Sequence, residues 1–308
     1  MPRVIEHAAA APIELGALVE ALETGRFDPR DEDCFAEFGP LLGSLCRNRD
    51  FLADLVVDEL KQRCRTQSAT NGYGPQVVLL HQSNAFFIRA NFWPSNDDAV
   101  LQENGREAFF YHVPHDHNFS FLTAGYLGPG YWSDYYEYDY DSVIGTPGEP
   151  VDLRFVERAR LAEGQVMLYR AHRDVHAQLP ADALSVSINI MEQSPGLAYR
   201  DQYRFDTADN SVAEILNRAA VEPLLALCAH LGGGNARDLV HEYAAFHPSD
   251  RIQFSAVKAL ASRCATVDER LAVYERAGRS GSAFVEGMAT RQRAAIERGR
   301  EWIERHAD

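Results

Sequence analysis

The stretch FSFLTAGYLGPGYWSDYYEYDYD, residues 119–141, decides the fold class. Two runs rich in aromatic and apolar residues, 119–127 and 131–141, are separated only by the turn residues Gly-Pro-Gly. Short runs of this composition, bounded by turn residues, are typical of β-strands. We therefore expect two strands here, one on each side of the turn.

Similar runs continue on both sides of these two strands. The further predicted strands are QVVLLH (76–81), AFFIRANFW (85–93), EAFFYHV (107–113), VDLRFVERARL (151–161), GQVMLYRA (164–171) and ALSVSINIME (183–192). Turn signals separate these short runs, and no helical pattern lies between them. The sequence thus predicts an all-β core, an antiparallel sandwich or barrel of the jelly-roll kind.

Both flanks of this block have the 3.6-residue spacing of helices. The spacing predicts three helices between residues 12 and 64, and five more after Asp206. We expect these helices to pack outside the barrel without contributing metal ligands. The predicted division is an N-terminal helical region at 1–73, a barrel with a metal site at 74–206, and a C-terminal helical region at 207–308.

Composition excludes several classes of protein. The formal net charge of -15 argues against a nucleic-acid or anionic-membrane surface, since both need a positive contact patch. No apolar run approaches the roughly 20 residues that span a bilayer, and we expect a cytoplasmic protein. The odd number of scattered cysteines predicts reduced, buried thiols and neither a disulfide framework nor a zinc knuckle. They are Cys34, Cys46, Cys64, Cys228 and Cys264.

Three histidines in the β block stand in a pattern that suits metal binding. On a strand, His115 and His117 would share one face while Asp116 points to the other. Two imidazoles spaced in this way can converge on one ion. His176 follows a glycine-led strand and a turn, where a barrel of this size brings the chain back. We expect these three histidines to bind one metal, with no carboxylate ligand.

Two other histidines compete for this role. His172 lies at the turn just before His176 and is the alternative third ligand. His112 has the wrong strand parity relative to His115, so we leave it outside the ligand set.

The block resembles the cysteine dioxygenase group of the cupin superfamily. PHDHNFSFLTAGYLGPGYWSDYYEYD (114–139) is similar to the first metal-binding motif of that group, in which HDH precedes a strand, a glycine turn and a second strand. EGQVMLYRAHRDVHAQLPADALSVSINIMEQSP (163–195) is similar to the second motif, and NAFFIRANFWP (84–94) fits the strand that leads toward HDH. The resemblance implies a cupin double-stranded β-helix with a single iron(II) bound by His115, His117 and His176.

The chain also departs from that group. Ordinary cupins have a glutamate four or five residues after H-x-H, where Phe121 and Leu122 stand here, which agrees with a ligand set of three histidines. The family's supporting His and Tyr match Asn189 and Met191, and the arginine that holds its substrate's carboxylate matches Gln76. These differences argue against cysteine itself as the substrate.

Several residues near these motifs are candidates for contacting a substrate. Arg89 is unusual in an apolar strand and Arg170 lies beside the ligand loop, so either guanidinium could hold a carboxylate. Gln76 and Asn189 complete the substrate-binding candidates. Tyrosines at 126, 136 or 138 could donate a hydrogen bond to oxygen or substrate, with Tyr126 and Tyr138 as the catalytic candidates. The alternation of tyrosine with acidic residues at 136–141 also fits an outer strand with a solvated face.

The leading hypothesis is a mononuclear non-haem iron(II) dioxygenase or oxygenase acting on a small polar metabolite that bears a thiol or carboxylate. One alternative is a cupin isomerase or hydrolase with zinc, manganese or nickel as Lewis acid. Another is a ligand-sensing cupin without catalysis, which signals through its helical region. The expected partners are a small substrate and dioxygen, without nucleic acid or membrane, and a homodimer is left open.

Overall fold

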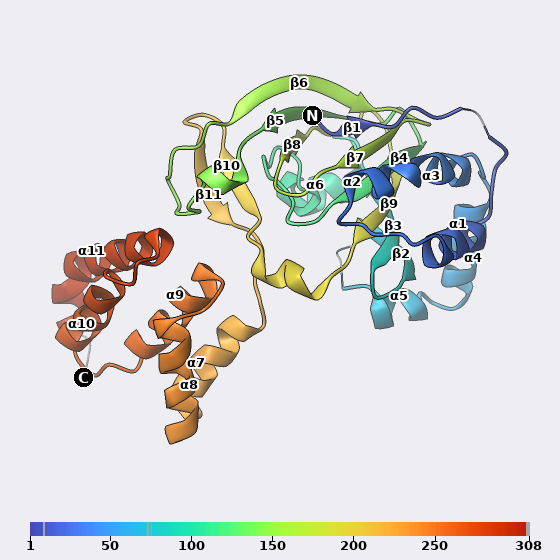
Figure 1. The fold of residues 1–308 in the computed structure, drawn as a ribbon. Coiled ribbons are helices and arrows are strands. Elements are labelled where there is room, and N and C mark those ends of the chain that lie inside the picture. The colour runs from blue at the N-terminus through green and yellow to red at the C-terminus, as the bar shows by residue number, and fades with distance from the viewer. Residues whose placement is uncertain (9, 73, 75, 306–308) are drawn as a thin grey trace. The chain divides into compact units, whose positions relative to one another are not determined.

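The computed structural model describes residues 1–8, 10–72, 74 and 76–305. Most of its strands form two antiparallel sheets, which are shown in Figure 1. The larger sheet has the strand order β1-β7-β4-β9-β3-β2, and the smaller has the order β6-β5-β8. The strands of these sheets are β1 (Arg3–Val4), β2 (Val77–Gln82), β3 (Phe86–Trp93), β4 (Phe121–Leu127), β5 (Tyr131–Glu137), β6 (Arg154–Leu161), β7 (Val166–Tyr169), β8 (Asp174–Gln178) and β9 (Ser185–Glu192). A separate pair consists of β10 (Tyr203–Asp206) and β11 (Ser211–Ile215).

The path of the chain between the sheets identifies the architecture. After β3 the segment around His115 bridges β8 of the smaller sheet, and β4 then returns to the larger one. The hairpin of β5 and β6 lies in the smaller sheet, after which β7, β8 and β9 alternate between the two. This is the connectivity of a jelly-roll barrel. The predicted all-β core with helical regions on both sides is therefore confirmed.

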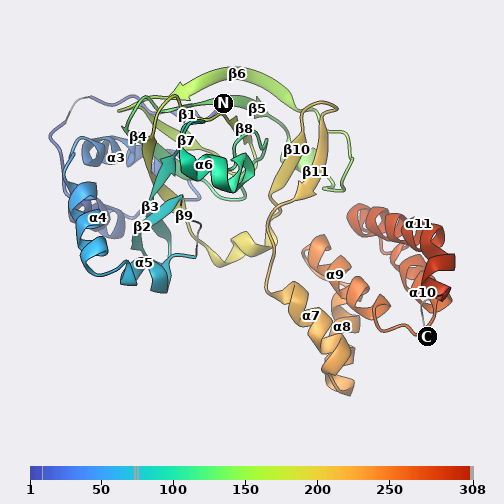
Figure 2. The same cartoon turned by 180° about the vertical axis from the view of Figure 1, so that it is seen from behind.

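The larger sheet is buried on both faces, and the two faces differ in chemistry. On β3, Phe86, Ile88 and Ala90 pack against the N-terminal helices, whereas Arg89 and the two residues at 91 and 93 face the barrel interior. The alternation follows from the two-residue period of a strand. Figures 1 and 2 show the helices along the outer side of this sheet. They are α1 (Leu15–Thr24), α2 (Glu32–Glu37), α3 (Gly39–Cys46), α4 (Phe51–Lys61) and α5 (Arg65–Thr70).

Contacts divide the described chain into two compact units. The barrel unit comprises 1–140, 150–197 and 202–213, and so includes the N-terminal helices. It also contains a short helix, α6 (Ala99–Asn104). The helical unit comprises 141–149, 198–201 and 214–308. The segment division that the sequence predicts, with boundaries after residues 73 and 206, remains a prediction.

The helical unit is built around one buried helix. Almost every side chain of α9 (Asp250–Ala261) is buried, because the other helices of the unit pack around it. Its start is fixed by Ser249, whose hydroxyl accepts a hydrogen bond from the Ile252 N–H. The surrounding helices are α7 (Val221–Leu231), α8 (Gly234–Ala245), α10 (Val267–Ala277) and α11 (Ala283–Arg305), so the five helices expected after Asp206 are present. None of the helices in the described part of the chain is long and apolar enough to cross a membrane.

Four local expectations were wrong. Residues 107–113 are not a strand: a 3-10 helix spans Arg106–Phe109, and Phe110 and His112 have φ of 58° and 59°. Strand β8, which carries His176, was not predicted. The run at 211–215, read as the start of a helix, forms β11 instead. Before Cys64 the chain forms four short helices rather than three.

The five cysteines are free in the structure, but only Cys46 is buried, so the expectation of buried thiols is wrong for the other four. Cys46, the last residue of α3, is buried in the core, and this burial raises the pKa of its thiol to about 12. Because the thiolate is the reactive form, we expect Cys46 to be the slowest of the five to react with an alkylating reagent at pH 8. Mass spectrometry of timed iodoacetamide reactions checks this. A Cys46 adduct that forms as fast as the Cys228 adduct in the folded protein would contradict the buried position of α3.

Candidate metal centre

The three histidines predicted to converge do so on one side of the barrel interior. His176 lies on β8, and its backbone N–H and C=O each bond the backbone of His115, with both N···O distances 3.0 Å. This antiparallel bridge sets the His115 and His176 rings side by side, with centroids 4.6 Å apart. His117 joins them because it lies two residues beyond His115. One nitrogen from each ring lies within 4.8 Å of the others.

The ring nitrogens are spaced as ligands of one ion would be. Nε2 of His117 and Nε2 of His176 lie 3.0 Å apart. Two nitrogens each bound at about 2.1 Å to the same ion would lie roughly 3 Å apart, so the spacing fits a metal. His115 donates from Nδ1 to the carbonyl of Val113 at 2.7 Å, which leaves the Nε2 lone pair for a ligand bond.

The three histidines are buried, and this burial determines their charge. Desolvation lowers the pKa of His115 to about 4. Desolvation also lowers the pKa of His117 and of His176 well below the ordinary value, and the neighbouring histidines lower both further. All three imidazoles are therefore neutral at pH 7, and the neutral ring is the form that binds a metal.

The segment that carries His115 and His117 is not a regular strand and is held by the residue between them. Asp116 is fully buried on the side away from the rings. Its carboxylate accepts hydrogen bonds from the Tyr138 hydroxyl and from the Tyr203 backbone N–H, both at 2.6 Å. A carboxylate with two donors at this distance anchors the loop strongly, so Asp116 positions both histidines.

Removing this anchor is expected to destabilise the protein. Asp116→Ala leaves two buried donors without an acceptor, so we expect the free energy of unfolding to fall by about 3 to 5 kcal/mol. Tyr138→Phe removes only one donor and should cost about 2 kcal/mol. Urea denaturation of the metal-free proteins measures both values. Equal stability of Asp116→Ala and the wild type would show that the loop is held in another way.

A cavity of about 310 Å³ opens beside the histidine cluster within the barrel unit. Its described lining residues include one guanidinium, five side-chain amides and several aromatic rings, but no aspartate or glutamate. The polar members besides the histidines are Gln76, Arg89, Asn91, Gln178, Asn189 and Gln202, and the aromatic members are Trp93, Phe110, Phe119, Phe121 and Tyr131. Its only fixed charge is therefore positive, which favours an anionic ligand.

Hydrogen bonds fix part of this lining before any ligand binds. The Thr123 hydroxyl donates to Oδ1 of Asn189 at 2.7 Å, and Nε1 of Trp93 donates to the Ser187 hydroxyl at 3.0 Å. Arg89 pairs with Asn189 in the register of β3 and β9, so their side chains lie on the same face of neighbouring strands. The cavity wall formed by β3 and β9 is therefore an ordered polar surface.

The predicted substrate-binding residues divide into two groups. Gln76, Arg89 and Asn189 line the cavity. Arg170 does not: its guanidinium holds the buried carboxylate of Asp174 through Nε at 2.9 Å and through a second nitrogen at 2.6 Å. A guanidinium committed to a buried acid is part of the fold, so Arg170 is not a substrate anchor here.

The two tyrosines predicted to be catalytic lie away from the cavity. The Tyr126 side chain points to the outer face of the sheet, where its hydroxyl donates to the carbonyl of Arg49 at 2.8 Å. Tyr138 is occupied by Asp116. A bulge in β4 between Gly125 and Leu127 interrupts the alternation of side chains between the two faces of the sheet. The sequence alone therefore could not predict the face on which Tyr126 lies.

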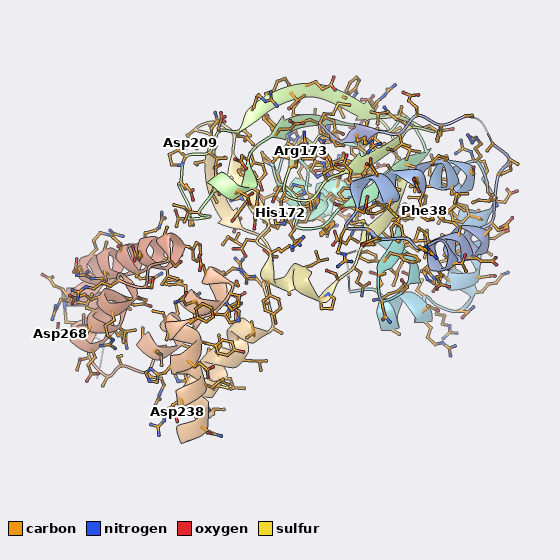
Figure 3. All side chains as sticks on the ribbon, viewed as in Figure 1. Phe38, His172, Arg173, Asp209, Asp238 and Asp268 are labelled. Atoms are coloured by element: carbon orange, nitrogen blue, oxygen red, sulfur yellow. The ribbon has the colours of Figure 1, made fainter. Side chains whose placement is uncertain are left out.

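His172 is not the third ligand of the cluster. Its backbone has a φ of 60°, and its ring lies edge-on to Tyr140 at a centroid distance of 3.8 Å. Figure 3 labels it on the loop between β7 and β8. Because a positive φ reverses the chain locally, His172 lies outside the strand whose parity directs His176 inward.

Several cavity residues were missed by the sequence analysis, among them Gln178, Asn91 and Tyr131. Gln178 follows His176 by two positions, so strand parity directs it to the same face, and its Nε2 lies 3.4 Å from the His176 Nε2. Asn91 follows Arg89 in the same way, and Tyr131 opens β5. The available signal was a polar residue recurring at every second position of an otherwise apolar strand.

Comparisons with known proteins find only distant structural likeness. No family model and no curated protein matches the chain. Among solved structures, the chain matches DMSP lyase DddQ from Ruegeria pomeroyi DSS-3 at 9% identity and a TM-score of 0.24, covering 41% of this chain and 54% of the lyase, so it spans about half of that protein. It matches hydroquinone 1,2-dioxygenase PnpCD at 12% identity and a TM-score of 0.25, covering 42% of this chain and 71% of that one. It also matches a cupin domain from Bordetella pertussis Tohama I at 9% identity and a TM-score of 0.23, covering 40% of this chain and 96% of that domain. Similarity at this level does not establish a family. On its own geometry the site is a buried cluster of three neutral histidines in a jelly-roll barrel, a candidate for a divalent metal.

Proposed function

We propose that this chain is a mononuclear non-haem iron(II) dioxygenase of the cupin class that acts on a small anionic metabolite. The observation that carries the proposal is the buried cluster of three neutral imidazoles opening onto a cavity with no described carboxylate in its lining. An ion held only by neutral donors keeps its full charge and has positions left for other ligands. A carboxylate or thiolate is the ligand that such a site attracts.

The chain's own residues bind and orient this substrate. Arg89 offers a planar fork that matches the two oxygens of a carboxylate. Asn189, fixed by the Thr123 hydroxyl, lies beside Arg89 and presents its amide to the same ligand. The aromatic rings of Trp93 and Phe121 exclude water, which strengthens these polar contacts.

The iron(II) ion, when bound by His115, His117 and His176, would supply the open positions at which substrate and dioxygen meet. The protein contributes position, and the hydroxyls of Tyr126 and Tyr138 take no part in the cavity because they are bonded elsewhere. Because the three histidines are neutral, they would hold the ion without reducing its positive charge. That charge would then attract the anionic substrate.

Anaerobic substrate addition tests this proposal. A panel of small carboxylates and thiols is added to the iron(II) protein under nitrogen, and the absorption spectrum is recorded before and after oxygen is admitted. We expect at least one compound to change the spectrum and then to consume oxygen in step with product. His117→Ala, treated in parallel, should show neither effect. An iron-loaded protein inert to oxygen with every compound would refute the proposal.

A Lewis-acid isomerase or hydrolase is the second candidate, because three histidines also form the ligand set of catalytic zinc sites. Such an enzyme, loaded with zinc, manganese or nickel, would turn over equally well with oxygen removed. The ligand-sensing alternative is favoured by the separate helical unit, none of whose described residues belongs to the cluster. It predicts ligand binding without turnover, accompanied by a change in oligomeric state.

A further inference from the structure

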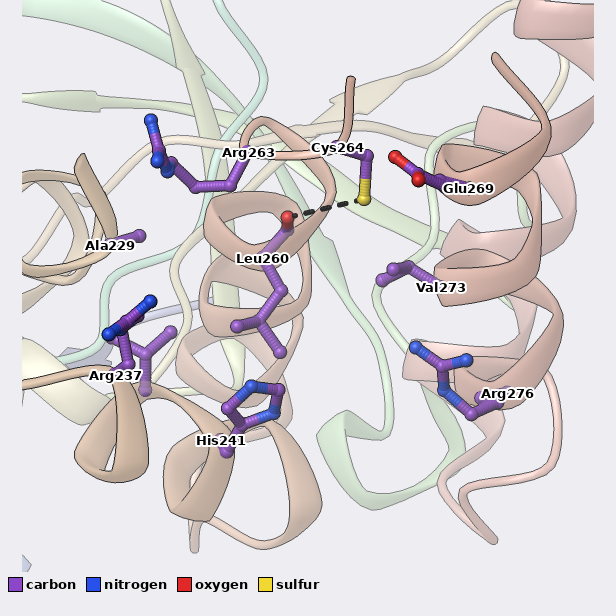
Figure 4. A pocket seen from close by; sticks show the side chains of 10 residues that line it. Ala229, Arg237, His241, Leu260, Arg263, Cys264, Glu269, Val273 and Arg276 are labelled. Atoms are coloured by element: carbon purple, nitrogen blue, oxygen red, sulfur yellow. Dashed lines mark hydrogen bonds between the residues drawn. The ribbon is translucent and has the colours of Figure 1, made fainter. Parts of the chain in front are cut away.

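A second cavity lies wholly within the helical unit, and its lining includes none of the three clustered histidines. It measures about 370 Å³ and is formed by α8, the end of α9, and α10. Its floor is apolar, made by Val240, Leu260 and Val273, and Figure 4 shows arginines around it. We call it the arginine groove, after Arg237, Arg263 and Arg276 in its lining.

The three guanidiniums come from different elements. Arg237 extends from the wall formed by α8, Arg276 from the wall formed by α10, and Arg263 follows the end of α9. His241 lies one helical turn after Arg237 and also lines the groove. Four basic side chains therefore share one concave surface in a chain whose net charge is -15.

The guanidiniums of these three arginines make no hydrogen bond or ion pair with any described residue. Elsewhere in the same unit arginines are paired: Arg251 bonds Asp201 at 2.6 Å, and Arg279 bonds Glu275 at 2.8 Å. Acidic residues are abundant in this chain, yet none of the described ones pairs with these three guanidiniums. Like charges gathered without partners repel one another, and a bound anion removes that cost.

Glu269, the one acid among the described residues that line the groove, does not supply the missing partner. Glu269 belongs to the capping box of α10, where its carboxylate accepts from the backbone N–H of Ala265 at 2.8 Å and of Thr266 at 3.3 Å. A carboxylate held by two backbone donors stays with the helix end. The positive charge of the groove is left for a ligand.

We propose that the arginine groove binds an organic phosphate, with the phosphate groups on Arg237, Arg263 and Arg276 and the apolar part of the molecule on the floor. Guanidinium forks match phosphate oxygens, and several forks suit a group that carries more than one charge. The volume lies within the range of small-molecule sites, roughly 300 to 1,000 Å³. This site is independent of the metal centre and of the proposed dioxygenase activity.

Calorimetric titration of the full chain tests the proposal, with ATP and inorganic tripolyphosphate as probes at fixed ionic strength and without added divalent metal. We expect ATP to bind with one site per chain, and about tenfold more tightly than tripolyphosphate, because only ATP has a body to cover the floor. Arg237→Gln, Arg263→Gln and Arg276→Gln should each weaken ATP binding about tenfold. The triple variant should not bind ATP.

The control is Arg279→Gln, which removes a charge near the same end of α10 but from an arginine that is already paired. It should bind ATP like the wild type, and so should His117→Ala, since the histidine lies in the barrel unit. Equal weakening in Arg279→Gln would show attraction by surface charge alone. No binding by the wild type, or full binding by the triple variant, would overturn the proposal, and equal affinity for the two probes would contradict the role of the floor.

Discussion

Replacing His176 with alanine is expected to abolish metal retention, whereas replacing His172 should leave it intact. His176 gives one of three nitrogens in the buried cluster, so its loss removes a ligand that no other described side chain in the cavity replaces in kind. Loss of a residue that only hydrogen-bonds a metal ligand lowers metal affinity roughly 10- to 100-fold. We expect the loss of the ligand itself to lower it further. Elemental analysis of the purified variants measures the retained metal.

The matched variants make this result interpretable. His115→Ala and His117→Ala should behave like His176→Ala, while His172→Ala controls for loss of an imidazole from the adjacent loop. Circular dichroism establishes that each variant is folded. Full metal occupancy in His176→Ala together with loss in His172→Ala would show that the third ligand is His172 and not His176.

Replacing Arg89 with methionine is expected to raise the KM for an anionic substrate about 100-fold with a smaller change in kcat. Arg89 is the only charged side chain other than histidine in the described lining of the cavity, so its loss removes a charge-assisted hydrogen bond made to the bound substrate. Arg89→Lys keeps the charge but loses the fork and should recover part of the affinity. Initial rates with the most active compound of the substrate panel measure both parameters.

Arg158→Met is the control for this experiment, because Arg158 is an exposed arginine paired with Asp134. It should leave KM unchanged, since a surface ion pair has little influence on the barrel interior. An unchanged KM in Arg89→Met would mean that the substrate's anionic group binds elsewhere.

Strand periodicity explains why most of the barrel could be predicted. Runs such as AFFIRANFW alternate between an outer face that packs on helices and an inner face, and both faces are read from the same two-residue period. Arg89 broke the apolar pattern, and it does line the cavity. The H-x-H spacing likewise gave His115 and His117 because proximity along the chain carries over directly into space.

The errors arise where a tertiary contact decides. EAFFYHV has the composition of a strand, but Phe109 and Tyr111 are instead inserted into the barrel core from a 3-10 helix and an irregular turn. Arg170 looked free in sequence, and its partner Asp174 becomes significant only because burial makes that pair part of the fold. Composition cannot distinguish such positions, because it contains no information on which distant residue lies opposite.

The metal content of the protein purified without added metal tests the central claim most directly. The account predicts about one iron per chain in the wild type and almost none in His117→Ala, with both proteins folded. A wild-type protein that contains no metal, or one whose metal content is the same after His117 is replaced, would contradict the assignment of the buried histidine cluster as the metal centre.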